Sequence, residues 1–115
     1  MPSHDDLDAG DLVWVELDPV RGSEQSGRQP AVVITPAAYH KVSYLAFVCP
    51  ITSSLGPWPF KVALPDDLKI RGAVLVDQVR AVDRAQRIFG RAGRVPDETL
   101  DRIRGILTAM IRPDE

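Results

Sequence analysis

The sequence predicts a mainly β fold, built as a small curled sheet or barrel with one helix at its C-terminal end. Short apolar segments rich in β-branched and aromatic residues recur along the chain, and Gly or Pro interrupts them at short intervals. Only the end of the chain has apolar residues at the three- and four-residue spacing of an amphipathic helix. Short strands without helical segments between them argue against βαβ units.

The expected strands each end at or near a turn-forming residue. They are residues 12–17, 31–35, 44–49, 60–64 and 73–76, with 79–82 as either a continuation or a sixth strand. The expected helix covers residues 97–111, with Asp97 as its N-cap and Glu98 near its positive end. An apolar stripe on this helix predicts that it packs against the sheet; the stripe is Leu100, Ile103, Leu107 and Met110.

Length and composition predict one domain over residues 1–115, with residues 1–9 as a flexible tail. The chain is 44% hydrophobic and 26% charged, which is ordinary for a globular protein. It contains no apolar run long enough to span a membrane and no secretory signal. Its single cysteine, Cys49, excludes an intrachain disulfide and favours a reducing cytoplasm. Cys49 itself is expected to be a buried, inert thiol.

Charge is distributed unevenly along the chain. A net charge of −2 argues against a general nucleic-acid coat. Residues 80–94 nevertheless hold five arginines and one acidic residue. This segment is interpreted either as a patch for an anionic ligand or as a solvated arginine face.

Two loops concentrate polar side chains. The first holds Ser23, Glu24, Gln25, Arg28 and Gln29, and its glycines allow sharp turns. By itself, such a loop is also compatible with a solvated hairpin connection.

The second polar loop follows the third expected strand and holds Thr52, Ser53 and Ser54. Trp58 lies there between two prolines. Its ring is interpreted either as a base-stacking platform or as a cover for one end of the barrel.

Several kinds of catalytic chemistry have little support in the sequence. Neither His4 nor His40 has metal-ligand spacing to a cysteine or carboxylate, so no metal site is predicted. No phosphate-binding glycine loop or dinucleotide fingerprint is present. The remaining carboxylates, arginines, hydroxyls and amides suit phosphate chemistry without a metal or cofactor.

Taken together, these segments resemble the MazF/PemK family of toxin endoribonucleases. The motifs that carry the resemblance are GDLVWV (10–15), Asp18-Pro19, GSEQ (22–25), Gly27, PAVVI (30–34), PITS (50–53), Pro59-Phe60 and DQV (77–79). The resemblance implies a small SH3-like barrel of five to six strands with a C-terminal helix, of the CcdB/MazF type, acting as a homodimer. It also implies metal-independent cleavage of single-stranded RNA at short sequences, without a cofactor, and inhibition by a cognate antitoxin. The RNA targets that it implies are mRNA, with tRNA and rRNA as further candidates.

The family places a glutamate, an arginine and a threonine around the scissile phosphate. The resemblance assigns the glutamate to Glu24 and the threonine to Thr52. The family's arginine directly precedes the loop proline, where this chain has Gln29, and an arginine lies one residue earlier at Arg28. We therefore expect Glu24, Arg28 and Thr52 to be catalytic. The expected RNA-binding residues are Ser23, Gln25, Gln29, Ser53, Trp58, Asp77, Gln78 and Arg80.

These residue types suit a reaction in which the RNA 2′-hydroxyl attacks the adjacent phosphorus and leaves a 2′,3′-cyclic phosphate and a 5′-hydroxyl. Glu24 can accept the proton, Arg28 can clamp the phosphate and Thr52 can donate to a non-bridging oxygen. Two alternatives stay open. One is a catalytically weakened module that binds RNA or antitoxin, and the other is a CcdB-like gyrase poison; the GSEQ motif and Thr52 favour the nuclease.

Overall fold

The computed structural model describes residues 6–17, 27–54 and 56–113 of the 115-residue chain. Over these residues the strands are β1 (Asp11–Glu16), β2 (Arg28–Val33), β3 (Leu45–Thr52), β4 (Lys61–Ala63), β5 (Ala73–Leu75), β6 (Arg80–Asp83) and β7 (Ile88–Arg94). The helices are α1 (Ala37–His40), the 3-10 helix η1 (Val76–Gln78), α2 (Arg84–Arg87) and α3 (Asp97–Ile111).

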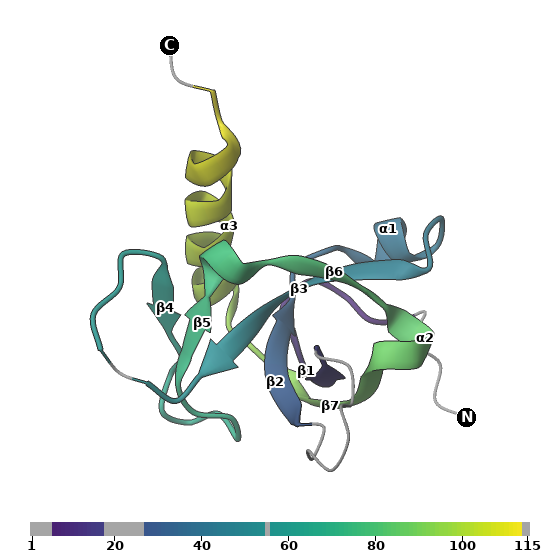
Figure 1. Cartoon of the computed structure of the whole chain (residues 1–115), viewed down its shortest axis with the longest axis horizontal. Helices are drawn as coiled ribbons and strands as arrows, with labels where there is room; N and C mark the ends of the chain where they lie inside the picture. Colours follow the sequence, from purple (N-terminus) through teal and green to yellow (C-terminus); the bar gives the residue numbers. More distant parts are fainter. Residues whose placement is uncertain (1–5, 18–26, 55, 114–115) are drawn as a thin grey trace.

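The strands pair antiparallel in the order β4-β5-β3-β2-β1-β7, and β6 pairs with β3 outside this path. The long strand β3 joins the two parts of the sheet. Along one side it pairs with β6, where Val48 lies opposite Arg80, and then with β5, where Thr52 lies opposite Ala73. The sheet curls around β3, and α3 projects from it (Figure 1). This architecture confirms the predicted fold class of a mainly β protein with a C-terminal helix.

Two apolar cores lie on the two faces of the curled sheet, because successive side chains of a strand point to opposite faces. Val13 of β1 and Ala31 of β2 belong to one core, and their neighbours Leu12 and Val32 belong to the other. The first, which we call the barrel core, consists of Leu7, Val13, Val15, Leu17, Ala31, Val33, Ala46, Val48, Val82 and Ile88. The second, which we call the helix core, includes Leu100 and Ile103 of α3.

Helix α3 has the predicted bounds but not the predicted cap. Its N-cap residue is Pro96, no side chain caps it, and Asp97 is its first helical residue. Asp97 therefore acts through its charge near the positive end of the helix dipole. Leu100 and Ile103 are buried, Leu107 is half-buried against the helix core and Met110 is 37% exposed, so the stripe is covered except at its last residue. No helix in the described part of the chain is both long and apolar enough to cross a membrane.

Strand β7 was not predicted from the sequence. Its residues, IFGRAGR, include two glycines and two arginines and have no regular apolar alternation. It is held as a strand by pairing with β1, with register shifts at two points along the pair. The prediction of five or six strands is therefore too low by one strand at least, over the described residues.

Strand β3 passes through Pro50, where the sequence predicted its end. Pro50 pairs with Ala31 of β2 on one side. On the other side it lies between the last residue paired with β6, Val48, and the first paired with β5, Ile51. A residue without an N–H group is tolerated there because the strand is changing partners at that point.

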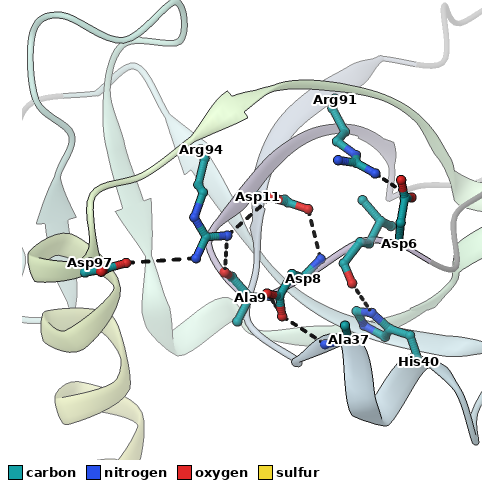
Figure 2. Close-up of polar contacts among 10 residues, drawn as sticks. Asp6, Asp8, Ala9, Asp11, Ala37, His40, Arg91, Arg94 and Asp97 are labelled. Atoms are coloured by element: carbon teal, nitrogen blue, oxygen red, sulfur yellow. Dashed lines mark hydrogen bonds and ion pairs between the residues drawn. The ribbon is translucent and has the colours of Figure 1, made fainter.

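The N-terminal segment is fixed to the barrel, so the predicted flexible tail of residues 1–9 is too long. Leu7 and Ala9 are buried, at 1% and 3% exposure. One carboxylate oxygen of Asp8 accepts hydrogen bonds of 2.9 Å from the backbone N–H groups of Ala9 and Ala37. These contacts lower the pKa of Asp8, chiefly through the bond from Ala37. Figure 2 shows the segment lying between α1 and β7.

Further polar contacts complete this attachment. His40 Nδ1 lies 2.8 Å from the Leu7 carbonyl, which can only accept, so this nitrogen donates the hydrogen bond. Asp6 pairs with Arg91, and Arg94 Nη1 donates to the Ala9 carbonyl at 2.6 Å. We call this set of residues the N-terminal clamp: Asp6, Leu7, Asp8, Ala9, Asp11, His40, Arg91 and Arg94.

Candidate active site

The predicted site residues fall into two groups. Ser23, Glu24 and Gln25 lie outside the described residues. The others lie at the start of β2, at the end of β3 and in the connection that follows it, in η1 and at the start of β6; they are Arg28, Gln29, Thr52, Ser53, Trp58, Asp77, Gln78 and Arg80.

Thr52 is the last residue of β3, and its surroundings fix its position. Its side-chain oxygen accepts a 3.1 Å hydrogen bond from the backbone N–H of Ser54, which turns the chain out of the strand. Behind it, Gly72 has a φ of +130°, and a Cβ there would lie 2.2 Å from the Thr52 carbonyl oxygen. Only glycine permits this approach of the two backbones.

Gln29 and Arg28 lie on opposite faces of β2. Side chains two residues apart on a strand point to the same face, so Gln29 shares a face with Ala31 and Thr52 shares one with Pro50. Ala31 and Pro50 are paired across β2 and β3. Alternation therefore puts Gln29 and Thr52 on one face of the sheet. Arg28 lies on the other face, where its guanidinium carbon is 3.8 Å from the centre of the Phe89 ring in β7.

Trp58 and Asp77, 19 residues apart in the sequence, are joined by hydrogen bonds between their side chains. The indole Nε1 donates to both carboxylate oxygens of Asp77, at 3.3 and 3.2 Å. The Trp58 ring also packs edge-to-face on Phe60, with 5.6 Å between ring centres. It is still 48% exposed. The ring is thus held in place and also accessible to a ligand, which is compatible with the base-stacking interpretation; stacking of a base on it stays a prediction.

Lys61 shapes the same loop and was missed in the sequence analysis. Its ammonium group donates to the carbonyl oxygens of Ser54 at 3.0 Å and Gly56 at 2.7 Å. The loop after Thr52 therefore folds back onto the start of β4. The only signal in the sequence was a cation directly after Phe60 in an otherwise apolar strand, which does not specify a partner.

The thiol of Cys49 lies close to this group and is not a nucleophile. Cys49 is fully buried, and burial, with a smaller contribution from the charge of Asp77, raises the pKa of its thiol to about 12. Only the thiolate is reactive. The expectation of a buried, inert cysteine is confirmed.

The arginine-rich segment 80–94 is neither a free anionic-ligand patch nor a solvated face along its whole length. Arg84 is 8% exposed and donates to the backbone carbonyls of His40, at the end of α1, and of Ser43, in the connection from α1 to β3. Arg87 pairs with Glu16 at 3.1 Å. Arg91 and Arg94 bind carboxylates of the N-terminal clamp (Figure 2). Arg80 is exposed, at the start of β6.

The described residues do not provide a metal-site arrangement. Among these residues, no three His, Cys, Asp or Glu side chains are grouped so that they could hold a metal ion. His40 is 2% exposed and is bound on both ring nitrogens, with Nε2 lying 2.7 Å from the Thr35 hydroxyl. His4 lies outside the described residues.

A family model described as "PemK-like, MazF-like toxin of type II toxin-antitoxin system" matches residues 8–111, nearly the whole chain. The chain belongs to this family. The resemblance carried by the GSEQ and PITS motifs is thereby confirmed.

Curated and solved members of the PemK/MazF family agree with this assignment. The "Endoribonuclease toxin MazF" of Escherichia coli K12 is 36% identical over 104 residues, which cover 90% of this chain and 93% of the relative. The Escherichia coli "Endoribonuclease PemK" is 37% identical over 112 residues, covering 92% and 83%. A crystal structure titled MazE-MazF (Form-II), from Deinococcus radiodurans, superposes with a TM-score of 0.84 at 39% identity, covering 95% of this chain and 98% of the other. The names of the curated relatives support the expected endoribonuclease activity.

Proposed function

We propose that this chain is a sequence-specific endoribonuclease toxin that cleaves single-stranded RNA without a metal ion and is inhibited by a cognate antitoxin. Family membership over residues 8–111 is the observation that carries the proposal. The placement of Thr52 supports it, because a fixed hydroxyl at a loop edge is suited to donate to a phosphate oxygen. mRNA is the proposed substrate, with tRNA and rRNA as further candidates, and the cytoplasm is the proposed location.

The proposed reaction uses the nucleophile that RNA carries. The 2′-oxygen forms a bond to the adjacent phosphorus and the bond to the 5′-oxygen breaks, leaving a 2′,3′-cyclic phosphate and a 5′-hydroxyl. Glu24 accepts the proton of the 2′-hydroxyl, and the leaving 5′-oxygen takes a proton from solvent. Thr52 donates to a non-bridging oxygen, on which charge develops in the transition state.

Arg28 is proposed to clamp the phosphate, which requires its guanidinium to leave Phe89. An exposed cation–π contact is worth about 0.5–1 kcal/mol. A hydrogen bond to a charged group contributes about 1.5–3 kcal/mol, and a guanidinium can make two to one phosphate. Binding the phosphate therefore offsets the loss of the ring contact. Arg28 is the first residue of β2 and follows Gly27, so the backbone before it has freedom to rotate.

The partner proposed for inhibition is an antitoxin, and the proposed assembly is a homodimer. A solved relative from Deinococcus radiodurans is titled as a MazE-MazF structure, and it is similar to this chain over 95% of its length. The exposed Met110 and Ile111 at the end of α3 are apolar side chains that an assembly would cover.

A second candidate function rests on Gln29. A neutral amide occupies the position that alternation puts on the face of Thr52, and the family's arginine is absent there. A protein with no cation at this point is a weakened enzyme that binds RNA or antitoxin without efficient cleavage. RNA cleavage assays on the purified protein separate the two candidates.

The deciding experiment is the mapping of new 5′ ends after a long single-stranded RNA is incubated with the protein in EDTA. We expect 5′-hydroxyl ends at one short recurring sequence, and no cleavage of DNA with the same sequence because DNA lacks the nucleophile. Thr52→Ala should cleave about 10²–10³ times more slowly, and Thr52→Ser should retain most of the activity. Ends bearing 5′-phosphate would contradict the mechanism. Inhibition of DNA supercoiling without RNA cleavage would indicate a CcdB-like gyrase poison.

A further inference from the structure

A cavity of about 400 Å³ lies beside the candidate active site, on the opposite face of β2 from Gln29 and Thr52. Its size is within the range of small-ligand sites. Its lining comes from β1, β2, β7 and the connection from β4 to β5; the residues are Trp14, Pro30, Lys69, Ile70, Arg71, Arg91 and Ala92. We call it the Trp14 cavity.

Trp14 supplies an exposed aromatic ring to this cavity. It lies in the middle of β1, paired with Pro30 of β2 and with Gly90 of β7, so its backbone is held on both sides. Neither neighbour covers the ring with a long side chain, and a Cβ at Gly90 would meet no atom within 4 Å. The indole is therefore 40% exposed although it belongs to a central strand.

Three cations line the same cavity. Lys69 and Arg71 are exposed on the connection from β4 to β5. Arg91 is 44% exposed at its side chain and is paired with Asp6, whose hydrogen bond raises the pKa of the guanidinium. The cavity lining contains no acidic residue, and only Arg91 is partly neutralised, by Asp6. The positive charge of Lys69 and Arg71 therefore favours an anionic ligand.

The Trp14 cavity adjoins the candidate site around the edge of the sheet. Arg71 precedes Gly72, whose backbone touches the Thr52 carbonyl, and Ala73 pairs with Thr52. On the other side, Pro30 directly follows Gln29. An RNA chain that leaves the candidate site across this edge therefore reaches the Trp14 cavity within a short distance. In Figure 1 the connection between β4 and β5 passes close to the end of β3.

We propose that the Trp14 cavity is a second RNA subsite, which takes a nucleotide flanking the cleaved linkage. The base stacks on the indole of Trp14, and the phosphates bind Lys69 and Arg71. An exposed aromatic face among cations is the arrangement that binds single-stranded nucleic acid without reading its sequence. Each nucleotide supplies both a π-face and a phosphate, whereas an acidic side chain of a peptide supplies only the charge. The proposal rests on the proposed function, since it assumes that the adjoining site holds RNA.

The test combines binding and cleavage for a matched set of charge-reversal variants. Lys69→Glu and Arg71→Glu alter the Trp14 cavity, and Lys41→Glu, at the end of α1, is the control with the same change of charge. All three side chains are exposed, so folding should be preserved. The probe is a fluorescein-labelled mixed-sequence RNA of about 20 nucleotides, long enough to cover more than one subsite. Its affinity is measured by anisotropy in EDTA at several salt concentrations, and KM and kcat are measured on a long RNA.

We expect each cavity variant to weaken RNA binding and raise KM about tenfold, while kcat changes less than twofold, because the flanking contact does not touch the scissile phosphate. The slope of log affinity against log salt concentration should also become shallower by about one, which corresponds to the loss of one phosphate contact. Trp14→Phe should retain binding, and Trp14→Leu should lose it to the same extent as the charge reversals.

Three results would overturn the proposal or relocate it. Affinity and KM equal to those of Lys41→Glu would exclude RNA from the cavity. Unchanged RNA binding with weakened antitoxin binding would assign the cavity to an acidic peptide and overturn the RNA subsite. If the parent protein binds the labelled RNA but cleaves none, and the cavity variants lose that binding, then the proposed function fails while the subsite is supported.

Discussion

The N-terminal clamp and the candidate active site both concentrate polar side chains. In the clamp these side chains are bound to partners within the fold, whereas the candidate site keeps an aromatic side chain accessible to a ligand. In the clamp, Arg94 binds Asp11 and the Ala9 carbonyl, and Asp8 binds two backbone N–H groups. At the candidate site, Trp58 and Asp77 bind each other and the Trp58 ring is still half exposed.

This difference shows that a count of charged residues along the sequence does not locate a ligand site. The segment 80–94 has five arginines, and four of them are bound to carboxylates or backbone carbonyls of the same chain. Exposed cations that hold no carboxylate or carbonyl partner among the described residues are better candidates. Arg28, Lys69 and Arg71 come from other segments of the chain.

The largest expected effect concerns the two neighbouring residues Arg28 and Gln29. If Arg28 is the phosphate clamp, Arg28→Ala should lower kcat on RNA about 10²–10³-fold, which is the usual cost of losing a donor that stabilises charge in the transition state. Phe89→Leu should leave kcat unchanged or raise it up to about fivefold, because it removes a cation–π contact of about 0.5–1 kcal/mol that competes with the phosphate. Single-turnover cleavage of one RNA measures all variants.

Gln29→Arg provides the opposing test for the same pair. If Arg28→Ala cleaves at the parent's rate and Gln29→Arg gains activity, the clamp belongs at position 29, on the face of Thr52. Urea unfolding of each variant is the control, since Arg28 is exposed and Gln29 is only half-buried at the start of β2, and both should contribute little to stability.

Arg84 should behave in the opposite way, as a residue of structure rather than catalysis. It is 8% exposed and donates to the carbonyls of Ser43 at 2.6 Å and His40 at 3.0 Å. Arg84→Met keeps the aliphatic stem but leaves these carbonyls without their charged donor, so we expect a loss of about 2–4 kcal/mol in the free energy of unfolding. Arg80→Met, at an exposed position, should change it by less than about 0.5 kcal/mol. A normal stability for Arg84→Met would contradict this role.

A smaller effect is expected at the pair formed by Trp58 and Asp77. Trp58→Phe and Asp77→Asn each weaken or remove the indole hydrogen bond and should raise KM for RNA about two- to tenfold. The double variant should be no worse than either single variant, because both changes act on one contact. Trp58→Ala also removes the ring, and should raise KM further if a base stacks there. Strictly additive effects of the two single changes would show that Asp77 does not act by positioning Trp58.

The sequence predicted most of the fold because its signals were local. The helix 97–111 follows from apolar spacing, and β1 follows from its β-branched and aromatic residues. β7 had no such signal, because pairing with β1 holds a segment with two glycines and two arginines in place. Likewise, Pro50 ends a strand in most local contexts, and only the exchange of partners along β3 makes it acceptable.

The candidate site was predicted as a set of residues but not as an arrangement. Thr52 and Trp58 were identified from their loop, whereas the bond from Trp58 to Asp77 joins residues 19 positions apart. Strand alternation does indicate opposite faces for Arg28 and Gln29, but nothing in the sequence pairs Arg28 with Phe89. Contacts of this kind depend on the register of β1, β2 and β7, which the sequence alone did not specify.

The smallest expected effect tests the N-terminal clamp through pH. Hydrogen bonds from Ala37 and Ala9 lower the pKa of Asp8 below its ordinary value of 3.8, so the folded state favours the carboxylate. The contribution of Asp8 is therefore complete above that value and is lost as the pH falls through the lowered pKa of the folded protein. Because Asp8 is exposed, we expect it to be below about 1 kcal/mol. Asp8→Asn should be less stable than the parent near neutral pH, and the difference should vanish under acid conditions in thermal unfolding measured across the acid range. Asp101→Asn, on the exposed face of α3, serves as the control, and a difference for Asp8→Asn that persists unchanged in acid would show that the Asp8 carboxylate charge does not hold α1 to the N-terminal segment.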